Sequence, residues 1–74
     1  MYAFNYAGSN KRYEFPADDV EHAVRRVFAT WRKQSAWSAG YWSAILSQDG
    51  KPIGNIGFPH FQSSDAPTYT PLSH

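Results

Sequence analysis

The sequence contains no cysteine, and this absence excludes several classes of protein at once. A disulfide framework, a metal site built from thiolates and a cysteine nucleophile all require this residue. The sequence also has no apolar run near the ~20 residues of a transmembrane helix, and residues 1–15 lack the charged and then apolar pattern of a signal peptide. We therefore expect a soluble, cytoplasmic protein with no membrane segment.

Neither sign of charge is in large excess. Seven Lys or Arg residues and six Asp or Glu residues give a net charge of +1. The sequence pI of ≈ 8.1 lies below the value of about 9 above which a domain carries a typical nucleic-acid footprint. An electrostatic contact with a partner must therefore come from a local cluster of cations rather than from the charge of the whole chain.

A chain of 74 residues has room for one domain only. A domain of this size buries only about 60% of the surface of its unfolded chain, so it needs a dense core. Three Trp, five Tyr and five Phe residues can supply that core, because each such side chain buries roughly 150–250 Å². The initial methionine and a capped helix predict a complete small protein.

The stretch from Asp18 to Lys33 predicts an amphipathic helix around which the rest of the chain is organised. Its apolar residues form one stripe at helical spacing, with Ala23 at the margin: Val20, Val24, Val27, Phe28 and Trp31. A second stripe lies about 180° away and is mainly basic: His22, Arg25, Arg26, Ala29, Arg32 and Lys33. We expect Asp18 to be the N-cap, with Glu21 three residues on, and Gln34 to lie near the end.

Two hairpins are predicted on either side of this helix. Residues 2–15 alternate between aromatic and other residues around Gly8-Ser9-Asn10, which favours a hairpin over one long bulged strand. Residues 41–58 flank Asp49-Gly50, the pair preferred in a two-residue type I′ turn. This register places Leu46 opposite Ile53, Tyr41 opposite Phe58 and Trp42 opposite Gly57, with Pro52 beside the turn at an edge or a bulge.

The order of hairpin, helix, hairpin and tail indicates an α+β fold. We expect an antiparallel sheet of three to four strands with one amphipathic helix packed on one face. Residues 1–58 form the single compact domain. Residues 59–74 contain three prolines, several Ser and Thr residues and little apolar periodicity, which predicts an extended or disordered C-terminal tail.

The predicted register places large apolar residues on both faces of the sheet, although one helix covers only one face. Trp42 and Leu46 fall on one face, whereas Tyr41, Ile56 and Phe58 fall on the other, as does Ile45. Either the tail or the twist of the sheet closes the core of a monomer, or a second subunit or another partner covers the open face. A homodimer is therefore one of the expected arrangements.

The basic stripe of the helix is the main candidate binding surface. It has a structural explanation as the polar face that the helix shows to water, and cations in the last turn are favoured by the helix dipole. Arg25 and Arg26 lie too far from the C-terminus for the dipole to explain them, and arginine favours specific contacts with carboxylates or phosphates. The candidate partner-binding residues are Arg25, Arg26, Arg32, Lys33 and Trp37.

Other patterns with chemical meaning are better explained by structure. His22, His60 and His74 lack the spacing of metal ligands, and no serine lies in a strand–turn–helix elbow. Gly54-Asn55-Ile56-Gly57 has the spacing of a KH-type loop but lies within a predicted strand. Adjacent Asp18 and Asp19 point apart, as capping residues do. We expect no enzyme activity, no cofactor and no metal.

A short, cysteine-free, aromatic-rich chain with strands around one capped helix resembles the compact phage-encoded anti-CRISPR proteins that inhibit type I surveillance complexes. The resemblance covers residues 1–58 and depends on size, the order of elements and the arginine face. It implies a non-catalytic inhibitor in the cytoplasm of the host cell that docks on a subunit of the guide-RNA complex and blocks target DNA. Many of these inhibitors mimic DNA with acidic surfaces, so the charge of +1 implies contact with a Cas protein through aromatic and arginine residues instead.

Three functions are therefore considered. The first is a protein-binding inhibitor module that acts by occupying a surface of its partner. The second is a small nucleic-acid-binding domain that uses the basic helix face together with Lys11. The third is a structural or assembly subunit.

Overall fold

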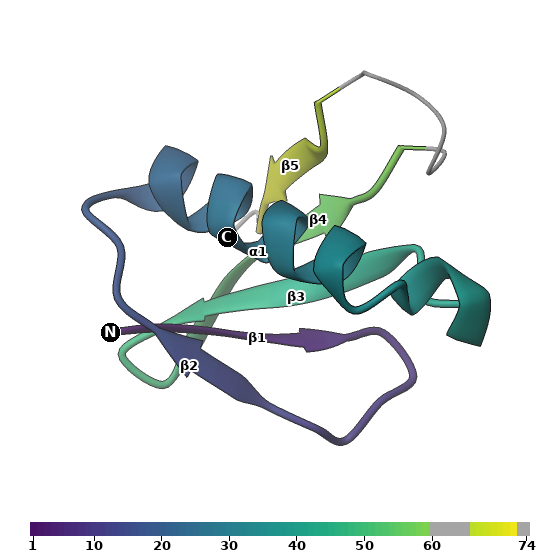
Figure 1. Cartoon of the computed structure of the whole chain (residues 1–74). Coiled ribbons are helices and arrows are strands. Elements are labelled where there is room, and N and C mark those ends of the chain that lie inside the picture. Colours follow the sequence, from purple (N-terminus) through teal and green to yellow (C-terminus); the bar gives the residue numbers. More distant parts are fainter. Residues whose placement is uncertain (60–65, 73–74) are drawn as a thin grey trace.

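The computed structural model describes residues 1–59 and 66–72, and in it one α-helix packs on a five-stranded antiparallel sheet (Figure 1). The elements in chain order are β1 (Tyr2–Tyr6), β2 (Tyr13–Phe15), α1 (Val20–Lys33), the 3₁₀ helix η1 (Ala36–Ala39), β3 (Ser43–Gln48), β4 (Lys51–Gly57) and β5 (Thr68–Pro71). The strand order is β2-β1-β3-β4-β5. The predicted α+β class, the antiparallel sheet and the single helix on one face are confirmed.

The sheet has one strand more than the three to four predicted. Both predicted hairpins are present, since β2 pairs with β1 and β3 pairs with β4. The additional strand is β5, which lies within residues 59–74, the stretch predicted to be an extended or disordered tail. Because β5 pairs with β4, the sheet continues beyond residue 58. The prediction for residues 60–65 and 73–74 lies outside the described residues.

A β-bulge in the β3–β4 hairpin changes the predicted register. Asp49 and Gly50 have φ angles of 52° and 85°, as a type I′ turn requires, so the predicted turn is confirmed. Between Leu46 and Ser47 the pairing shifts by one residue, so Leu46 pairs with Gly54 instead of Ile53. A shift of one residue moves every following side chain to the other face of the sheet.

The predicted pairs beyond the bulge are therefore wrong. Gly57 pairs with Ser43 instead of Trp42, and the Phe58 N–H donates to the carbonyl oxygen of Trp42, at 3.0 Å, in place of a pairing with Tyr41. Leu46, Ile56 and Phe58 consequently all lie under α1, in one core cluster. The large apolar residues that seemed divided between two faces lie mainly on one.

The opposite face of the sheet is made of smaller and more polar residues. A cross-strand row runs over four strands, through Asn5, Ile45, Asn55 and Thr70. Glu14, Asn55, Thr68 and Thr70 are exposed. The predicted division of Leu46 from Ile56 and Phe58 between two faces was wrong, because the bulge brings all three to the face under α1. The homodimer stays a prediction.

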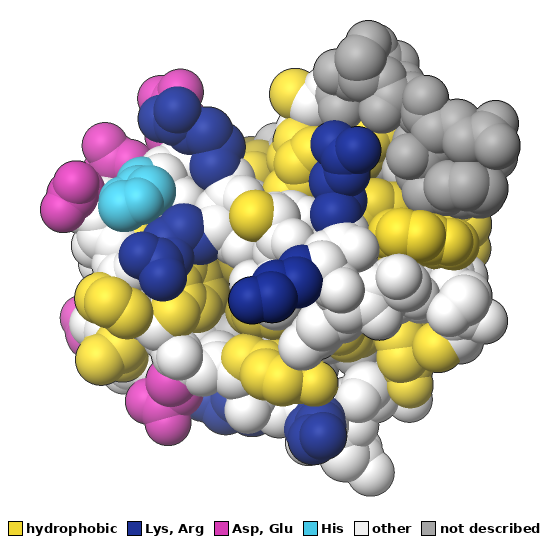
Figure 2. Space-filling model, in the orientation of Figure 1, with side chains coloured by type: hydrophobic (Ala, Val, Ile, Leu, Met, Phe, Trp, Pro, Cys, Tyr) yellow, Lys and Arg dark blue, Asp and Glu magenta, His cyan; other side chains and the backbone are white. Residues whose placement is uncertain are grey.

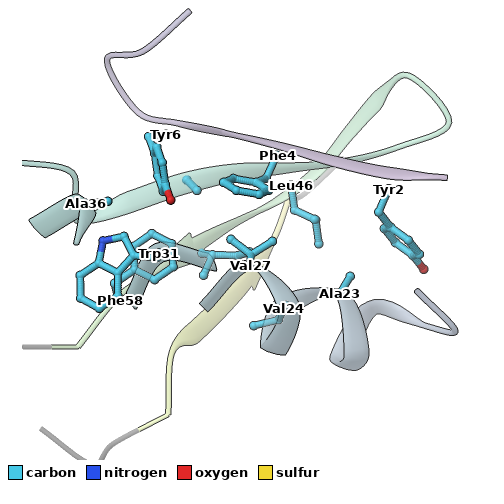
Figure 3. Packing of buried hydrophobic residues seen from close by; sticks show 12 residues of the cluster. Tyr2, Phe4, Tyr6, Ala23, Val24, Val27, Trp31, Ala36, Leu46 and Phe58 are labelled. Carbon is cyan, nitrogen blue, oxygen red and sulfur yellow. The ribbon is translucent and has the colours of Figure 1, made fainter. Parts of the chain in front are cut away.

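The apolar stripe of α1 packs on the sheet as predicted. Val27 and Trp31 are fully buried, and Ala23, expected at the margin of the stripe, is fully buried as well. Figure 3 shows Val27 and Trp31 pointing toward Phe4 and Leu46 of the sheet and toward Phe58, which follows β4. The N-cap is Asp19 rather than Asp18, because the Asp19 carboxylate accepts a hydrogen bond from the His22 N–H at 2.8 Å. The helix ends at Lys33, with Gln34 as its C-cap.

The outer edge of β5 carries a proline where a backbone N–H would otherwise face outward. In an antiparallel pair, residues alternate between those that bond to the partner strand and those whose backbone faces away. The Leu72 N–H donates to the Ile53 carbonyl at 3.1 Å, so this alternation directs the backbone of Tyr69 and Pro71 away from β4. Because proline has no N–H, Pro71 removes one donor from this edge.

The other edge of the sheet, formed by β2, also has few outward backbone donors. The Ala7 N–H donates to the Ser43 carbonyl at 2.9 Å, so alternate residues of β1 bond to β3 and those between them bond to β2. The same alternation turns the backbone of Glu14 and Pro16 outward. A charged residue and a proline therefore occupy the outer positions, and both discourage pairing with another strand.

Candidate functional site

The outer side of α1 is a basic face, made of Arg25, Arg26, Arg32 and Lys33. All four side chains belong to exposed residues, so the predicted separation of the apolar and basic stripes is confirmed. Figure 2 shows Lys and Arg side chains spread over the helix, with carboxylates gathered at its N-terminal end. A seven-residue step such as Arg25 to Arg32 or Arg26 to Lys33 spans about 10 Å along a helix.

The four cations differ in their partners within the chain. The Arg25 Nη2 atom lies 3.6 Å from the Glu21 Oε1 atom, an exposed i, i+4 pair. The Arg32 guanidinium lies over the Phe28 ring, 5.6 Å from its centroid. Arg26 and Lys33 make no ion pair within the described part of the chain. These two cations can pair with an external anion without losing an internal partner.

Carboxylates lie at the other end of the helix. Asp19 caps the first turn, and the Asp18 Oδ2 atom lies 3.6 Å from the His22 Nδ1 atom. Glu21 is the acidic residue of the first turn, whereas Arg32 and Lys33 are in the last turn. The helix surface is thus acidic at its start and basic at its end, which is the distribution that the helix dipole favours.

Trp37 lies in η1, directly after α1, rather than on a continuation of the helix. Its ring meets the buried Trp31 ring edge to face, with centroids 5.4 Å apart, and the residue is partly buried against the core. Ser35 and Gly40 flank η1 with φ angles of 52° and 84°. Gly40 ends η1 in the left-handed region, which favours glycine, and η1 brings Trp37 beside the basic end of α1.

Trp42 is an exposed residue that the sequence reasoning did not select. It is 41% exposed, and its ring meets Trp31 edge to face with centroids 5.7 Å apart. The predicted register placed Trp42 opposite Gly57, on the same face of the sheet as Leu46, and it was therefore not considered as a residue of the binding surface. Its position directly before β3 was the available signal, because residues at strand ends are less often covered by a neighbouring layer.

Two hollows lie beside the helix. One, of about 500 Å³, lies over the start of the basic face and is lined by Asp18, Asp19, His22, Arg25, Arg26 and Ala29. The other, of about 380 Å³, lies between α1 and β5, and its lining includes Val20, Val24, Pro67 and Tyr69. Neither lining contains a Ser, Thr or Cys beside a general base, so neither has the arrangement used in nucleophilic catalysis.

Metal-binding and phosphate-loop arrangements are absent from the parts of the chain that can be described. Residues 1–59 and 66–72 contain no group of three or more His, Asp or Glu side chains that could hold a metal ion. His60 and His74 lie outside the described residues. Gly54 is buried in β4 and Gly57 ends that strand, so the KH-type spacing lies in a sheet and not between two helices.

No family model, curated protein or solved structure matches this chain. Among residues 1–59 and 66–72, no helix has the length and apolar character needed to cross a membrane.

Proposed function

We propose that this chain is a non-catalytic protein-binding module, which inhibits its partner by occupying part of the partner's surface. The contact is made by the basic face of α1 together with Trp37. The observation that carries the proposal is the exposure of Arg26 and Lys33 on a packed helix, where neither makes an ion pair within the described residues. A fixed helix presents such cations to a carboxylate-rich surface with little further ordering.

The distribution of charge favours a protein partner over nucleic acid. Asp18, Asp19 and Glu21 precede the basic residues on the same helix, and Glu21 lies 3.6 Å from Arg25. These carboxylates would repel the closely spaced phosphates of a nucleic acid. A protein surface can match both signs, because its own charges need not be of one sign.

The resemblance to type I anti-CRISPR proteins supplies the specific form of this proposal. The partner would be a protein subunit of a type I CRISPR surveillance complex, and its occupation by this chain would block target DNA. The proposal does not need a homodimer, because Leu46, Ile56 and Phe58, which the predicted register had divided between two faces, lie together in the core cluster under α1.

Charge reversal on the helix tests this function. The double variant Arg25→Glu, Arg26→Glu should keep its fold and bind a purified type I surveillance complex at least about tenfold more weakly than the wild type. The matched control is Arg12→Glu, Lys51→Glu, which makes the same change in net charge at two exposed residues outside α1. Equal binding by the wild type and both variants would overturn the proposal.

A gel-shift series with duplex DNA distinguishes the proposed protein-binding function from the alternative of nucleic-acid binding. We expect no shift at low salt. If a complex forms and its affinity falls steeply as salt is added, the basic face binds phosphates and the alternative replaces the proposal. The slope of the logarithm of affinity against the logarithm of salt concentration would then fall by about 0.9 for each phosphate contact removed by substitution.

A further inference from the structure

A third hollow, of about 300 Å³, lies beyond the C-terminal end of α1, where the β1–β2 loop meets η1. Ser9 and Lys11 line it from the loop, and Ser35 and Ser38 line it from the segment of η1. We call it the η1 hollow. Figure 1 shows this loop and η1 at the same end of the molecule. Small-molecule sites have volumes of about 300–1,000 Å³, so the η1 hollow has room for a small ligand only.

Three tyrosines form the aromatic part of the η1 hollow. Tyr6 is buried, and its ring stacks on the Tyr41 ring with centroids 5.1 Å apart and an angle of 8° between the planes. Tyr13 meets the Tyr6 ring edge to face, with centroids 6.2 Å apart. Tyr13 and Tyr41 are partly exposed. Because both rings contact the buried Tyr6, a ligand that packs on one of them loses little binding free energy to ordering it.

The polar groups of the η1 hollow are mainly hydrogen-bond donors. The Tyr6 hydroxyl donates to the Gln34 Oε1 atom at 2.8 Å, which engages the amide oxygen and leaves the amide nitrogen to donate. Within the described part of the chain, the Tyr13 and Tyr41 hydroxyls make no hydrogen bond and the Lys11 ammonium makes no ion pair. None of the described lining residues is acidic. The hollow therefore offers one positive charge and several donors to a ligand whose oxygen atoms accept hydrogen bonds.

Ser35 lines this hollow with a backbone conformation that glycine adopts without strain. Its φ and ψ angles are 52° and 41°, in the left-handed region. The Ser35 carbonyl oxygen accepts from the N–H of Ser38 at 3.0 Å and from the hydroxyl of Ser38 at 2.8 Å, so the conformation is held in place. The Ser35 side chain makes no capping hydrogen bond to η1, so capping does not explain the serine. Strained residues of this kind cluster at binding sites.

We propose that the η1 hollow binds a small carboxylate whose apolar part is flat. The carboxylate pairs with Lys11, and the flat apolar part packs on the ring of Tyr13 or Tyr41. One ammonium matches a single negative charge, and no arginine is among the described lining residues to hold a phosphate through two N–H groups. This inference goes beyond the proposed function and does not rest on it, since Arg25 and Arg26 do not line the η1 hollow.

The test is a titration of the full chain with sodium benzoate, followed by the backbone ¹H–¹⁵N signals. We expect saturable movement of the signals of residues 9–13 and 34–41. Benzamide, which has the same shape without the charge, should bind at least about tenfold more weakly. Lys11→Gln should lower the affinity for benzoate at least about tenfold. Lys51→Gln is the matched control, because it removes the same charge at an exposed residue that does not line the hollow.

A second variant, Ser35→Gly, keeps the fold, because glycine takes the left-handed conformation freely. It should bind benzoate about two- to tenfold more weakly, since it lacks the hydroxyl. Equal affinity of the wild type and either Lys11→Gln or Ser35→Gly would overturn the inference. No saturable movement, equal affinity for benzamide, or tighter binding of inorganic phosphate than of benzoate would also overturn it. The proposed function fails separately: an absence of benzoate binding leaves the partner contact of α1 standing, and loss of that contact leaves this site standing.

Discussion

The ring of Tyr69 on β5 lies directly over Gly54 on β4. A Cβ atom added at Gly54 would come within 2.5 Å of the Tyr69 Cε1 atom. The Tyr69 hydroxyl donates to the carbonyl oxygen of Ile53 at 3.1 Å, so the ring is held across the strand beside it. An aromatic ring over a strand glycine covers backbone that has no side chain of its own. This contact helps to explain why the short segment Thr68–Pro71 joins the sheet.

Gly54→Ala should therefore destabilise the protein. The added methyl group pushes the Tyr69 ring away and weakens its hydrogen bond to Ile53, at a cost of about 1–3 kcal/mol in the free energy of unfolding. Urea unfolding measures the change. Gly57→Ala is the matched control, because a Cβ at Gly57 would have its nearest neighbour at 3.9 Å. Equal effects of the two substitutions would contradict the packing of Tyr69 on Gly54.

The helix cap gives a second prediction. Asp19→Ala should lower the free energy of unfolding by about 1 kcal/mol, because the His22 N–H loses the carboxylate that accepts its hydrogen bond. Asp18→Ala should cost only a few tenths of a kcal/mol, since the Asp18 carboxylate is exposed and 3.6 Å from the His22 Nδ1 atom. Thermal or urea unfolding of both variants checks the order. A larger loss of stability in Asp18→Ala would contradict this assignment and would indicate that Asp18 is the N-cap, as predicted from the sequence.

The missing N–H of Pro71 at the outer edge of β5 gives a prediction about self-association of the protein. Replacing Pro71 by Thr supplies an outward N–H to an edge strand, and the variant should self-associate at concentrations at which the wild type shows no change. Sedimentation velocity measures this. Thr70→Val is the control, because the Thr70 backbone belongs to the set directed toward β4. Unchanged sedimentation of Pro71→Thr would mean that the proline does not protect this edge.

Tyr6 should make stability depend on pH in the alkaline range. Burial, with a smaller contribution from Tyr13, raises the pKa of Tyr6 from 10.0 to about 12, and the neutral hydroxyl donates to the Gln34 Oε1 atom at 2.8 Å. The unfolded chain therefore ionises before the folded one. The stabilising effect is complete below pH 10, and it is lost as the pH rises through about 12.

Tyr6→Phe tests this dependence. The variant should lose less stability than the wild type between pH 10 and 12, because one group no longer ionises preferentially in the unfolded chain. Urea unfolding at a series of pH values gives both curves. Burial also raises the pKa of Tyr69. Its effect on stability has the same sign in both proteins, so this effect cancels when the two curves are compared. Parallel loss of stability in the two proteins would contradict the assignment.

The helix and both hairpins could be predicted from the sequence because their signals are local. The spacing of Val20, Val27 and Trp31 defines a helix face without reference to the sheet. Asp49-Gly50 specifies its own turn. The bulge between Leu46 and Ser47 has no comparable signal, since it depends on the packing of Ile56 and Phe58 under α1. β5 was missed because its stability comes from pairing with β4 and from the contact of Tyr69 with Gly54.

The residues of the candidate site also fall into those that could be predicted from the sequence and those that could not. Arg25, Arg26, Arg32 and Lys33 could be identified as an exposed face, because helical periodicity alone determines which side of α1 faces water. The exposure of Trp42 could not be predicted, because the predicted register paired it with Gly57, whereas in the structure Gly57 pairs with Ser43. A three-dimensional cluster around Trp31, built from residues up to 27 positions apart such as Phe58, leaves no periodic pattern in the sequence.

Affinity capture from host-cell extract tests whether the basic face of α1 binds a protein. The full chain is immobilised, and the capture is carried out with and without nuclease. We expect that a protein partner captured by the wild type survives nuclease treatment, and that it is lost with Arg25→Glu, Arg26→Glu but not with Arg12→Glu, Lys51→Glu. Loss of the partner after nuclease treatment, or equal capture by both variants, would contradict it.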